Sequence, residues 1–289
     1  MERQRWLQVV ALIESLMQER PLGRFTFSLA DIARLFLWAV VHDRPVYWAC
    51  QPQHWPADLR PDRLPTPATM SRRLRRPEML ALIETLLRRR RRYAPRGLLY
   101  YVDGKPLALR NHTRDPDAKK GWASGGYAKG YKLHLISESP ANVRAWDVTP
   151  MNANEPRVAQ QLVPQARIQG YLLGDANYDT NPLHAACRKV GVQLVAPRRH
   201  GPGRGLGHRR HDPARLRCIE MLEQSQTGFG PLLHTQRPNI ERQFGCYSSV
   251  AGGINTLPPW VRRLHRVKLW IGAKLVLLIL HHQRLKRAR

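Results

Sequence analysis

Three acidic residues stand at positions from which they could share one site. Asp103 closes an apolar run in the stretch "YYVDGKPL", and Asp175 closes another in "GYLLGDANYD". Side chains at the ends of neighbouring strands can meet in the crevice beyond the sheet. Glu241 lies in "RPNIERQFG" beside Ile240 and Phe244, which are four residues apart and share one face of a helix. The pattern predicts that the three carboxylates converge.

Converging carboxylates suit the chemistry of divalent metal ions. Mg²⁺ and Mn²⁺ prefer oxygen ligands and keep positions open for water and phosphate. Two such ions, about 3.5–4 Å apart, can activate the attacking oxygen and stabilise the leaving oxygen of a phosphodiester. Without metal, three packed acids would raise one another's pKa. We therefore expect Asp103, Asp175 and Glu241 to bind two Mg²⁺ (or Mn²⁺) ions and to act on phosphodiesters.

Each of these acids also has an ordinary structural interpretation. Asp103 and Asp175 could be turn residues, and Glu241 stands at helical spacing from Arg237 for a salt bridge. The combination of strand ends, neighbouring glycines and order along the chain favours the metal site. We leave four other acids outside the site. Asp115 and Asp117 lie in a polar loop, and Asp147 lies within a strand. Asp179 is expected to cap the next helix.

Positive charge dominates the sequence. The 289 residues include 48 Lys and Arg against 21 Asp and Glu, a formal net charge of +27. Charge of one sign repels itself in a compact fold, so a polyanionic partner is the simplest reason to retain it. No basic amphipathic helix stands beside a lipidation signal, which favours nucleic acid over a membrane surface.

The cysteines predict no cross-linked framework. The four of them are far apart and form no C-x-x-C pair, so neither a zinc ribbon nor a set of disulfides is indicated. A reducing, cytoplasmic setting fits this usage. The most apolar stretch, "LWIGAKLVLLIL", contains a lysine and is too short to span a bilayer, so we expect a core helix.

Residues 1–95 carry apolar residues at helical spacing. Ser28 is placed to cap one helix, and Thr66 with Pro67 is placed to begin another. The basic segment that follows could form a helix-turn-helix that reaches a DNA groove, although a solvated charged face would have the same composition. The interpretation that we prefer is a helical DNA-binding region whose candidate contacts are Arg72, Arg73, Arg75 and Arg76.

After Pro95 the pattern changes from helical to mixed. "GLLYYVDG", "GYKLHLISES" and "NVRAWDVTP" have the composition of strands, and later strands alternate with helices. This order predicts an α/β fold, a mixed sheet with helices packed on it. Residues 199–212 are rich in Gly and Arg and are expected to form a basic loop.

Four blocks of this region carry a family resemblance. "YYVDGKPL", "KGYKLHLI", "GYLLGDANYD" and "RPNIERQFG" resemble, in order, the blocks of bacterial insertion-sequence transposases of the DDE type. The resemblance covers roughly residues 97–250. It implies a ribonuclease H-like catalytic fold, two Mg²⁺ ions, and cleavage and strand transfer of DNA at the ends of the element.

The resemblance extends to the branch whose C-terminal motif is Tyr-x2-Arg-x3-Glu-x6-Lys. It implies that Asp103, Asp175 and Glu241 are the catalytic acids and that Arg237, the motif arginine, lies near DNA phosphates. Asp175 and Glu241 are 66 residues apart, wider than in compact relatives. We therefore expect an insertion at about 198–236 within a ribonuclease H-like domain that covers residues 96–289.

Two motif positions differ from the branch. His234 stands in place of the motif tyrosine and Ser248 in place of the motif lysine. These departures leave open an alternative, a catalytically inactive DNA-binding protein derived from a transposase. In either case the resemblance implies double-stranded DNA as partner (element ends and target), a homodimer on DNA and no membrane. The implied location is the bacterial cytoplasm, on the nucleoid when bound to DNA.

Two further groups have open interpretations. A zinc site could be assembled from His200, His208 and His211 with Cys218, but the spacing matches no common ligand set. Trp122 and Tyr127 lie among glycines and lysines in "KKGWASGGYAKGYK". They could stack on DNA bases or pack in the core.

Overall fold

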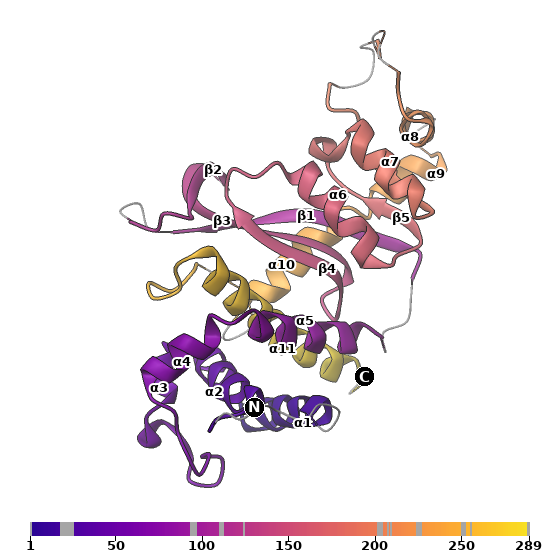
Figure 1. Cartoon of the computed structure of the whole chain (residues 1–289). Coiled ribbons are helices and arrows are strands. Elements are labelled where there is room, and N and C mark those ends of the chain that lie inside the picture. Colours follow the sequence, from indigo (N-terminus) through magenta and orange to yellow (C-terminus); the bar gives the residue numbers. More distant parts are fainter. Residues whose placement is uncertain are drawn as a thin grey trace. The chain divides into compact units, whose positions relative to one another are not determined.

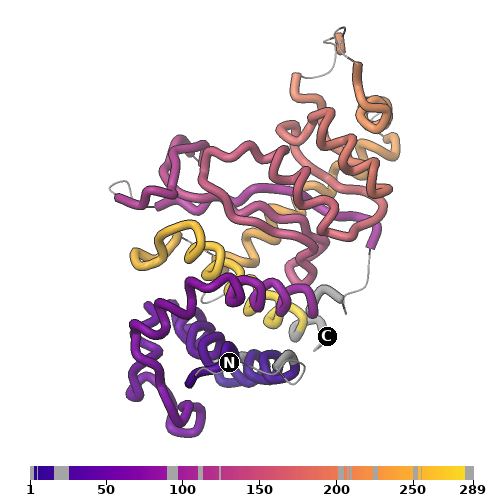
Figure 2. Tube along the Cα trace, in the orientation of Figure 1, coloured from indigo at the N-terminus to yellow at the C-terminus, as the bar shows by residue number. Residues whose placement is uncertain are grey.

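The structure is a computed structural model of the whole chain (Figures 1 and 2). It groups into two compact units: unit 1 comprises Met1–Tyr93 with Ser248–Arg289, and unit 2 comprises Ala94–Tyr247. In this division residues 248–289 group with the N-terminal helices. That the catalytic domain extends over residues 96–289 stays a prediction. The residues described are 2–17, 26–92, 97–109, 113–123, 125–200, 205–206, 208, 210–223, 227–249, 253–254 and 256–287.

All the regular secondary structure in the described residues of unit 1 is helical. Its helices are α1 (Glu2–Met17), α2 (Leu29–Val41), α3 (Val46–Ala49), the 3₁₀ turn η1 (Pro52–His54), α4 (Pro67–Leu74), α5 (Pro77–Arg92) and α11 (Leu264–Arg287). The sequence cues explain where two of them begin. Ser28 and Asp31 form a reciprocal capping box at α2, and the Thr66 hydroxyl accepts from the Thr69 N–H at α4, before Pro67.

Aromatic rings and one long apolar helix form the core of unit 1. Trp38 and Trp55 are stacked, and Trp6 meets both of them edge to face, with ring centroids 4.6–5.7 Å apart. Helix α11 packs against α5, α2 and α1, and its Trp270 meets Phe36 of α2 edge to face. The apolar stretch that we expected to be a core helix is therefore one, since most of its side chains are fully buried.

Unit 2 is built on one mixed sheet. Its strands are β1 (Leu99–Ala108), β2 (Lys119–Ala123), β3 (Gly126–Ser139), β4 (Asn142–Pro150), β5 (Gly170–Leu173) and β6 (Val192–Val195). β3 lies antiparallel to β1, β2 and β4, while β1, β5 and β6 run parallel. The predicted fold class, an α/β ribonuclease H-like mixed sheet flanked by helices together with an all-helical N-terminal region, is confirmed.

Helices cover both faces of this sheet (Figure 1). On one face α6 (Glu155–Ala166) and α7 (Asn181–Lys189) bury alternate residues of β1, such as Tyr100 and Val102. On the other face lies α10 (Asn239–Ser249), whose Asn239 and Gln243 hydrogen-bond the side chains of Tyr101 and Ser137. Tyr101 and Ser137 are register partners, so α10 is fixed to the β1–β3 ladder.

The segment between β6 and α10 carries α8 (Pro213–Glu223) and α9 (Phe229–His234). It coincides with the range 198–236 in which we expect an insertion, and much of the expected basic loop, residues 201–204, 207 and 209, lies outside the described residues. Over the described part of the chain, no helix combines the length and apolar character needed to cross a membrane.

Candidate active site

One guanidinium contacts all three acids that the sequence singled out. Nη2 of Arg237 lies 3.3 Å from Oδ2 of Asp103 and 3.7 Å from Oδ2 of Asp175. Nη1 of the same side chain donates a hydrogen bond to Oε1 of Glu241. The acids come from a strand, a turn and a helix separated by many residues, so the structure brings the four predicted residues of unit 2 together.

Strand register explains why the two aspartates are neighbours. Tyr101 of β1 pairs with Leu173, the last residue of β5, and the two strands are parallel. Asp103 and Asp175 each lie two residues beyond this pair, at one level and on one side. One expectation was wrong: Asp103 does not end its strand, because β1 continues to Ala108 and pairs there with β3. β5 ends at Leu173, so Asp175 lies in the turn beyond it.

Glu241 lies in the first turn of α10, where a carboxylate also complements the helix dipole. Its neighbours Ile240 and Phe244 are buried as the spacing predicted, while 60% of the Glu241 side chain remains exposed. Arg237 lies just before the helix and, at four residues' distance, can reach both Glu241 and the sheet. An exposed acid that is fixed by its helix can turn toward a ligand in solvent.

Asp103 is the most perturbed acid of the group. Its pKa is raised to about 6, chiefly by burial and to a smaller extent by the charges of Asp175 and Glu155. The Gly104 N–H, 2.7 Å from Oδ1, and the Arg237 guanidinium act in the opposite direction. A carboxyl with a pKa near neutrality in a crevice is typical of functional sites.

A fourth acid, Glu155, stands beside this group and was missed by the sequence analysis. It lies in the first turn of α6, receives a hydrogen bond from the Tyr178 hydroxyl at 3.1 Å and pairs with Lys132 Nζ at 2.6 Å. A Cβ at Gly104 would lie 2.7 Å from its Oε2, so a side chain at this position would displace the carboxylate. In sequence, Glu155 has the appearance of an ordinary first-turn acid.

The two positions that depart from the transposase motif have different surroundings. Burial and the nearby Arg237 charge lower the pKa of His234, at the end of α9, against the opposing effect of Asp175. The imidazole is therefore neutral at pH 7 beside the acid group. The Ser248 hydroxyl, by contrast, donates to the Ile254 carbonyl at 3.2 Å, a local contact.

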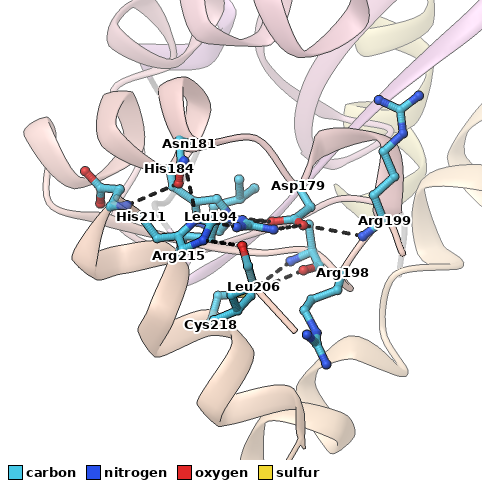
Figure 3. A network of polar contacts seen from close by, with 12 residues as sticks. Asp179, Asn181, His184, Leu194, Arg198, Arg199, Leu206, His211, Arg215 and Cys218 are labelled. Atoms are coloured by element: carbon cyan, nitrogen blue, oxygen red, sulfur yellow. Dashed lines mark hydrogen bonds and ion pairs between the residues drawn. The ribbon is translucent and has the colours of Figure 1, made fainter. Parts of the chain in front are cut away.

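The turn that carries Asp175 is fixed by a buried polar network (Figure 3). Asp175 caps the 3₁₀ turn η2 (Ala176–Tyr178), and Asp179 follows it. Both carboxylate oxygens of Asp179 accept hydrogen bonds of 2.7 Å from Arg215 of α8, and His184 Nε2 lies 3.4 Å away. We expected Asp179 to cap α7, and this was wrong: the residue before α7 is Thr180, which makes no side-chain cap.

The network also accounts for residues of the zinc alternative. His211 Nδ1 lies 2.7 Å from Arg215 Nη1, and the Cys218 thiol is buried against Ala196. His200 and His208 are exposed. Among the described residues, no three His, Cys, Asp or Glu side chains stand close enough together to hold a metal ion as placed. At the acid group, the carboxylates are arranged around the Arg237 guanidinium.

The arginines predicted to contact DNA belong to unit 1 and separate into two groups. Arg72, Arg73 and Arg76 line a hollow of about 390 Å³ together with the polar residues Thr26 and Thr69. Burial lowers the pKa of Arg73, and the neighbouring charge of Arg76 lowers it further.

Arg75 points elsewhere within unit 1. Its guanidinium donates to the Ser71 carbonyl and hydroxyl at 3.2 and 3.1 Å. It lines a mostly apolar hollow of about 240 Å³ beside Trp260 and Trp270.

Comparison with known proteins identifies the family. A family model described as transposase DDE domain matches residues 95–279, which is more than half of the chain and contains the three acids with Arg237. No curated protein and no solved structure matches the chain. The resemblance drawn from the four sequence blocks is confirmed, and the chain belongs to the transposase DDE domain family.

Proposed function

We propose that this protein is a DNA transposase that cleaves DNA at the ends of an insertion sequence and transfers the strands to a target. Asp103, Asp175 and Glu241 are its catalytic acids. The proposal is carried by one observation: the three acids meet around a single side chain, Arg237. Family membership supplies the reaction class. The site of action is the bacterial cytoplasm, on the nucleoid.

The chemistry of the acid group suits divalent cations. Three carboxylates share one guanidinium, and the raised pKa of Asp103 reflects burial together with the negative charge of its neighbours. Such a group gains from additional positive charge, and its ligand atoms are oxygens, which Mg²⁺ and Mn²⁺ prefer. Asp103, Asp175 and Glu241 would hold two ions, which supply an activated oxygen nucleophile and stabilisation of the leaving oxygen.

The protein's own side chains then have distinct roles. Asp103 must be ionised to bind a cation, so its pKa of about 6 sets a lower pH limit for activity. Arg237 holds the acids together in the free protein, and its planar guanidinium also suits a phosphate oxygen pair. When cations neutralise the acids, Arg237 is available to steer the DNA phosphate. Glu155 keeps Tyr178 and Lys132 in place beneath the site.

The helical unit supplies DNA binding in this proposal. Arg72, Arg73 and Arg76 project into one polar hollow, where threonine hydroxyls can share the hydrogen bonding of a phosphate. Double-stranded DNA, at the element ends and at the target, is the partner, and a homodimer would pair the two ends. The net charge of +27 favours such a polyanion.

The test replaces each acid by its amide. Asp103→Asn, Asp175→Asn and Glu241→Gln should each abolish Mg²⁺-dependent cleavage and strand transfer on the element's own ends while leaving DNA binding intact. Asp117→Asn, in a loop apart from the acid group, is the matched control and should keep full activity. Full activity in any of the three variants would remove that residue from the mechanism.

A second candidate is a transposase-derived DNA-binding protein that has lost catalysis. His234 and Ser248, in place of the motif tyrosine and lysine, favour it. Titration calorimetry with MgCl₂ and MnCl₂ separates the two candidates. An active enzyme binds Mn²⁺ in a manner that Asp103→Asn eliminates, whereas the inactive protein binds DNA and shows no acid-dependent metal binding.

A further inference from the structure

An exposed ribbon of unit 2 carries aromatic and basic side chains on one face. β2 pairs with the first residues of β3 in a two-stranded segment, and cross-strand partners point to the same side. Trp122 lies opposite Tyr127, and Lys120 lies opposite Lys129. Lys119 is also exposed, on the alternate side of β2. We call Trp122, Tyr127, Lys120 and Lys129 the ribbon face.

The opposite side of the ribbon is packed against the rest of unit 2. Gly121 and Ala123 alternate with Trp122 and are buried. A Cβ at Gly121 would lie 2.5 Å from the Met151 carbonyl oxygen, so the backbone there is in close contact. Because the inner side is fixed in this way, the ribbon face is held outward.

The two rings are unusually open to solvent. Trp122 is 66% exposed and Tyr127 77% exposed, although their centroids are 5.4 Å apart. An edge-to-face pair of this kind stabilises a ribbon by about 0.5–1.5 kcal/mol, which could explain the pair by itself. It does not explain the exposed Lys120 opposite Lys129, since like charges in that position destabilise a sheet. Lys129 itself donates a hydrogen bond to the Thr113 carbonyl at 3.0 Å.

The combination fits a ligand with flat apolar faces and negative charges. We propose that the ribbon face binds unpaired DNA, with Trp122 and Tyr127 stacked on bases and the lysines near phosphates. Duplex bases have no free faces, whereas unpaired bases stack readily on aromatic side chains. The rings are nearly perpendicular, at 88°, so they receive bases that have left a regular stack. This inference rests on the proposed function only in taking DNA as the substrate.

The first test measures binding of fluorescently labelled oligo-dT and of a duplex, by anisotropy in EDTA. Trp122→Ala and Tyr127→Ala should each weaken oligo-dT binding about tenfold and change duplex binding less than about threefold. Phe229→Ala is the matched control, because Phe229 is 57% exposed and meets Tyr171 edge to face at 5.5 Å. Trp122→Phe should restore most of the affinity, which separates stacking from loss of folding.

The second test concerns the charges. Lys120→Gln with Lys129→Gln should reduce the slope of log affinity against log salt for oligo-dT by about 1.4, two contacts at about 0.7 each. Lys189→Gln, at an exposed lysine of α7, should leave the slope unchanged.

Three outcomes would overturn the inference. Ring variants could bind oligo-dT like Phe229→Ala, or they could lose oligo-dT and duplex binding equally. They could also keep all DNA binding and lose a dimer detected by light scattering, which would make the ribbon face a protein interface. Binding of oligo-dT in EDTA does not need the acids. If the acid variants kept full cleavage activity, the binding of unpaired DNA by the ribbon face would still stand. If the ring variants bound oligo-dT normally, the cleavage proposal would still stand.

Discussion

At the residue scale, the ionised Asp103 carboxylate lowers the stability of the metal-free protein, because it is buried. Burial raises its pKa from 3.8 to about 6. The folded protein therefore binds a proton more tightly than the unfolded chain does, and stability falls as pH rises from about 4 to about 6. Above pH 6 the whole penalty remains, unless cations bind.

Asp103→Asn should therefore stabilise the metal-free protein at pH 7.5. The shift corresponds to at most about 3 kcal/mol, from which the lost attraction to Arg237 is subtracted. Urea unfolding in EDTA at pH 7.5 and pH 4 measures the effect, which should disappear at pH 4. Asp117→Asn serves as the control and should change neither value. A variant that is less stable at both pH values would contradict the burial argument.

At the element scale, the Asp179 network joins three segments. It connects the turn after β5, helix α7 and helix α8, which lies far along the chain (Figure 3). Burial alone would raise the pKa of Asp179, but hydrogen bonds from Arg215 and His184 hold the pKa of that carboxyl well below its usual range. Because the same turn carries Asp175, the network also fixes one wall of the candidate site.

Removal of one partner from this buried pair should be strongly destabilising. Asp179→Asn should lower the free energy of unfolding by about 3–5 kcal/mol at pH 7, because Arg215 keeps its charge without a counterion. The folded pKa is depressed, so the difference should shrink as pH falls below about 4. Glu223→Gln, which breaks a more exposed pair with Arg198, should cost less than about 1 kcal/mol. Equal losses in both variants would count against a special role for the network.

Sequence patterns recovered the elements better than their ends and partners. The caps at Ser28 and Thr66 are local hydrogen bonds, so residue type alone predicted them. The length of β1 beyond Asp103 depends on pairing with β3, a long-range contact with no local signal. For the same reason Asp179 was assigned to a cap, since its partner Arg215 is 36 residues away.

The candidate site was recoverable to a similar degree. The acids and Arg237 were found because the motif blocks carry them in order. Glu155 escaped notice because its role depends on the proximity of α6 to β1, which the spacing of residues along the chain does not reveal.

At the scale of the whole molecule, charge should govern DNA affinity. Each phosphate neutralised contributes about −0.9 to the slope of log affinity against log salt for duplex DNA. Replacement of Arg72, Arg73 and Arg76 by Ala should reduce the slope by about 2.7, three contacts in all. Arg75→Ala should change it little, because that guanidinium is bound to Ser71. A filter-binding series between 50 and 200 mM salt, with the four single variants, checks this; a larger change for Arg75→Ala than for the others would contradict the assignment.

Unit 1 is discontinuous: its last helix, α11, follows the whole of unit 2 in the chain. A ribosome therefore completes the sheet of unit 2 before it delivers the helix on which α2 and α5 pack. Until then the nascent helices expose the apolar surface that α11 will cover, a state prone to aggregation. A frameshift or early stop between α10 and α11 would consequently spare the acid group and leave α1, α2 and α5 without the helix on which they pack.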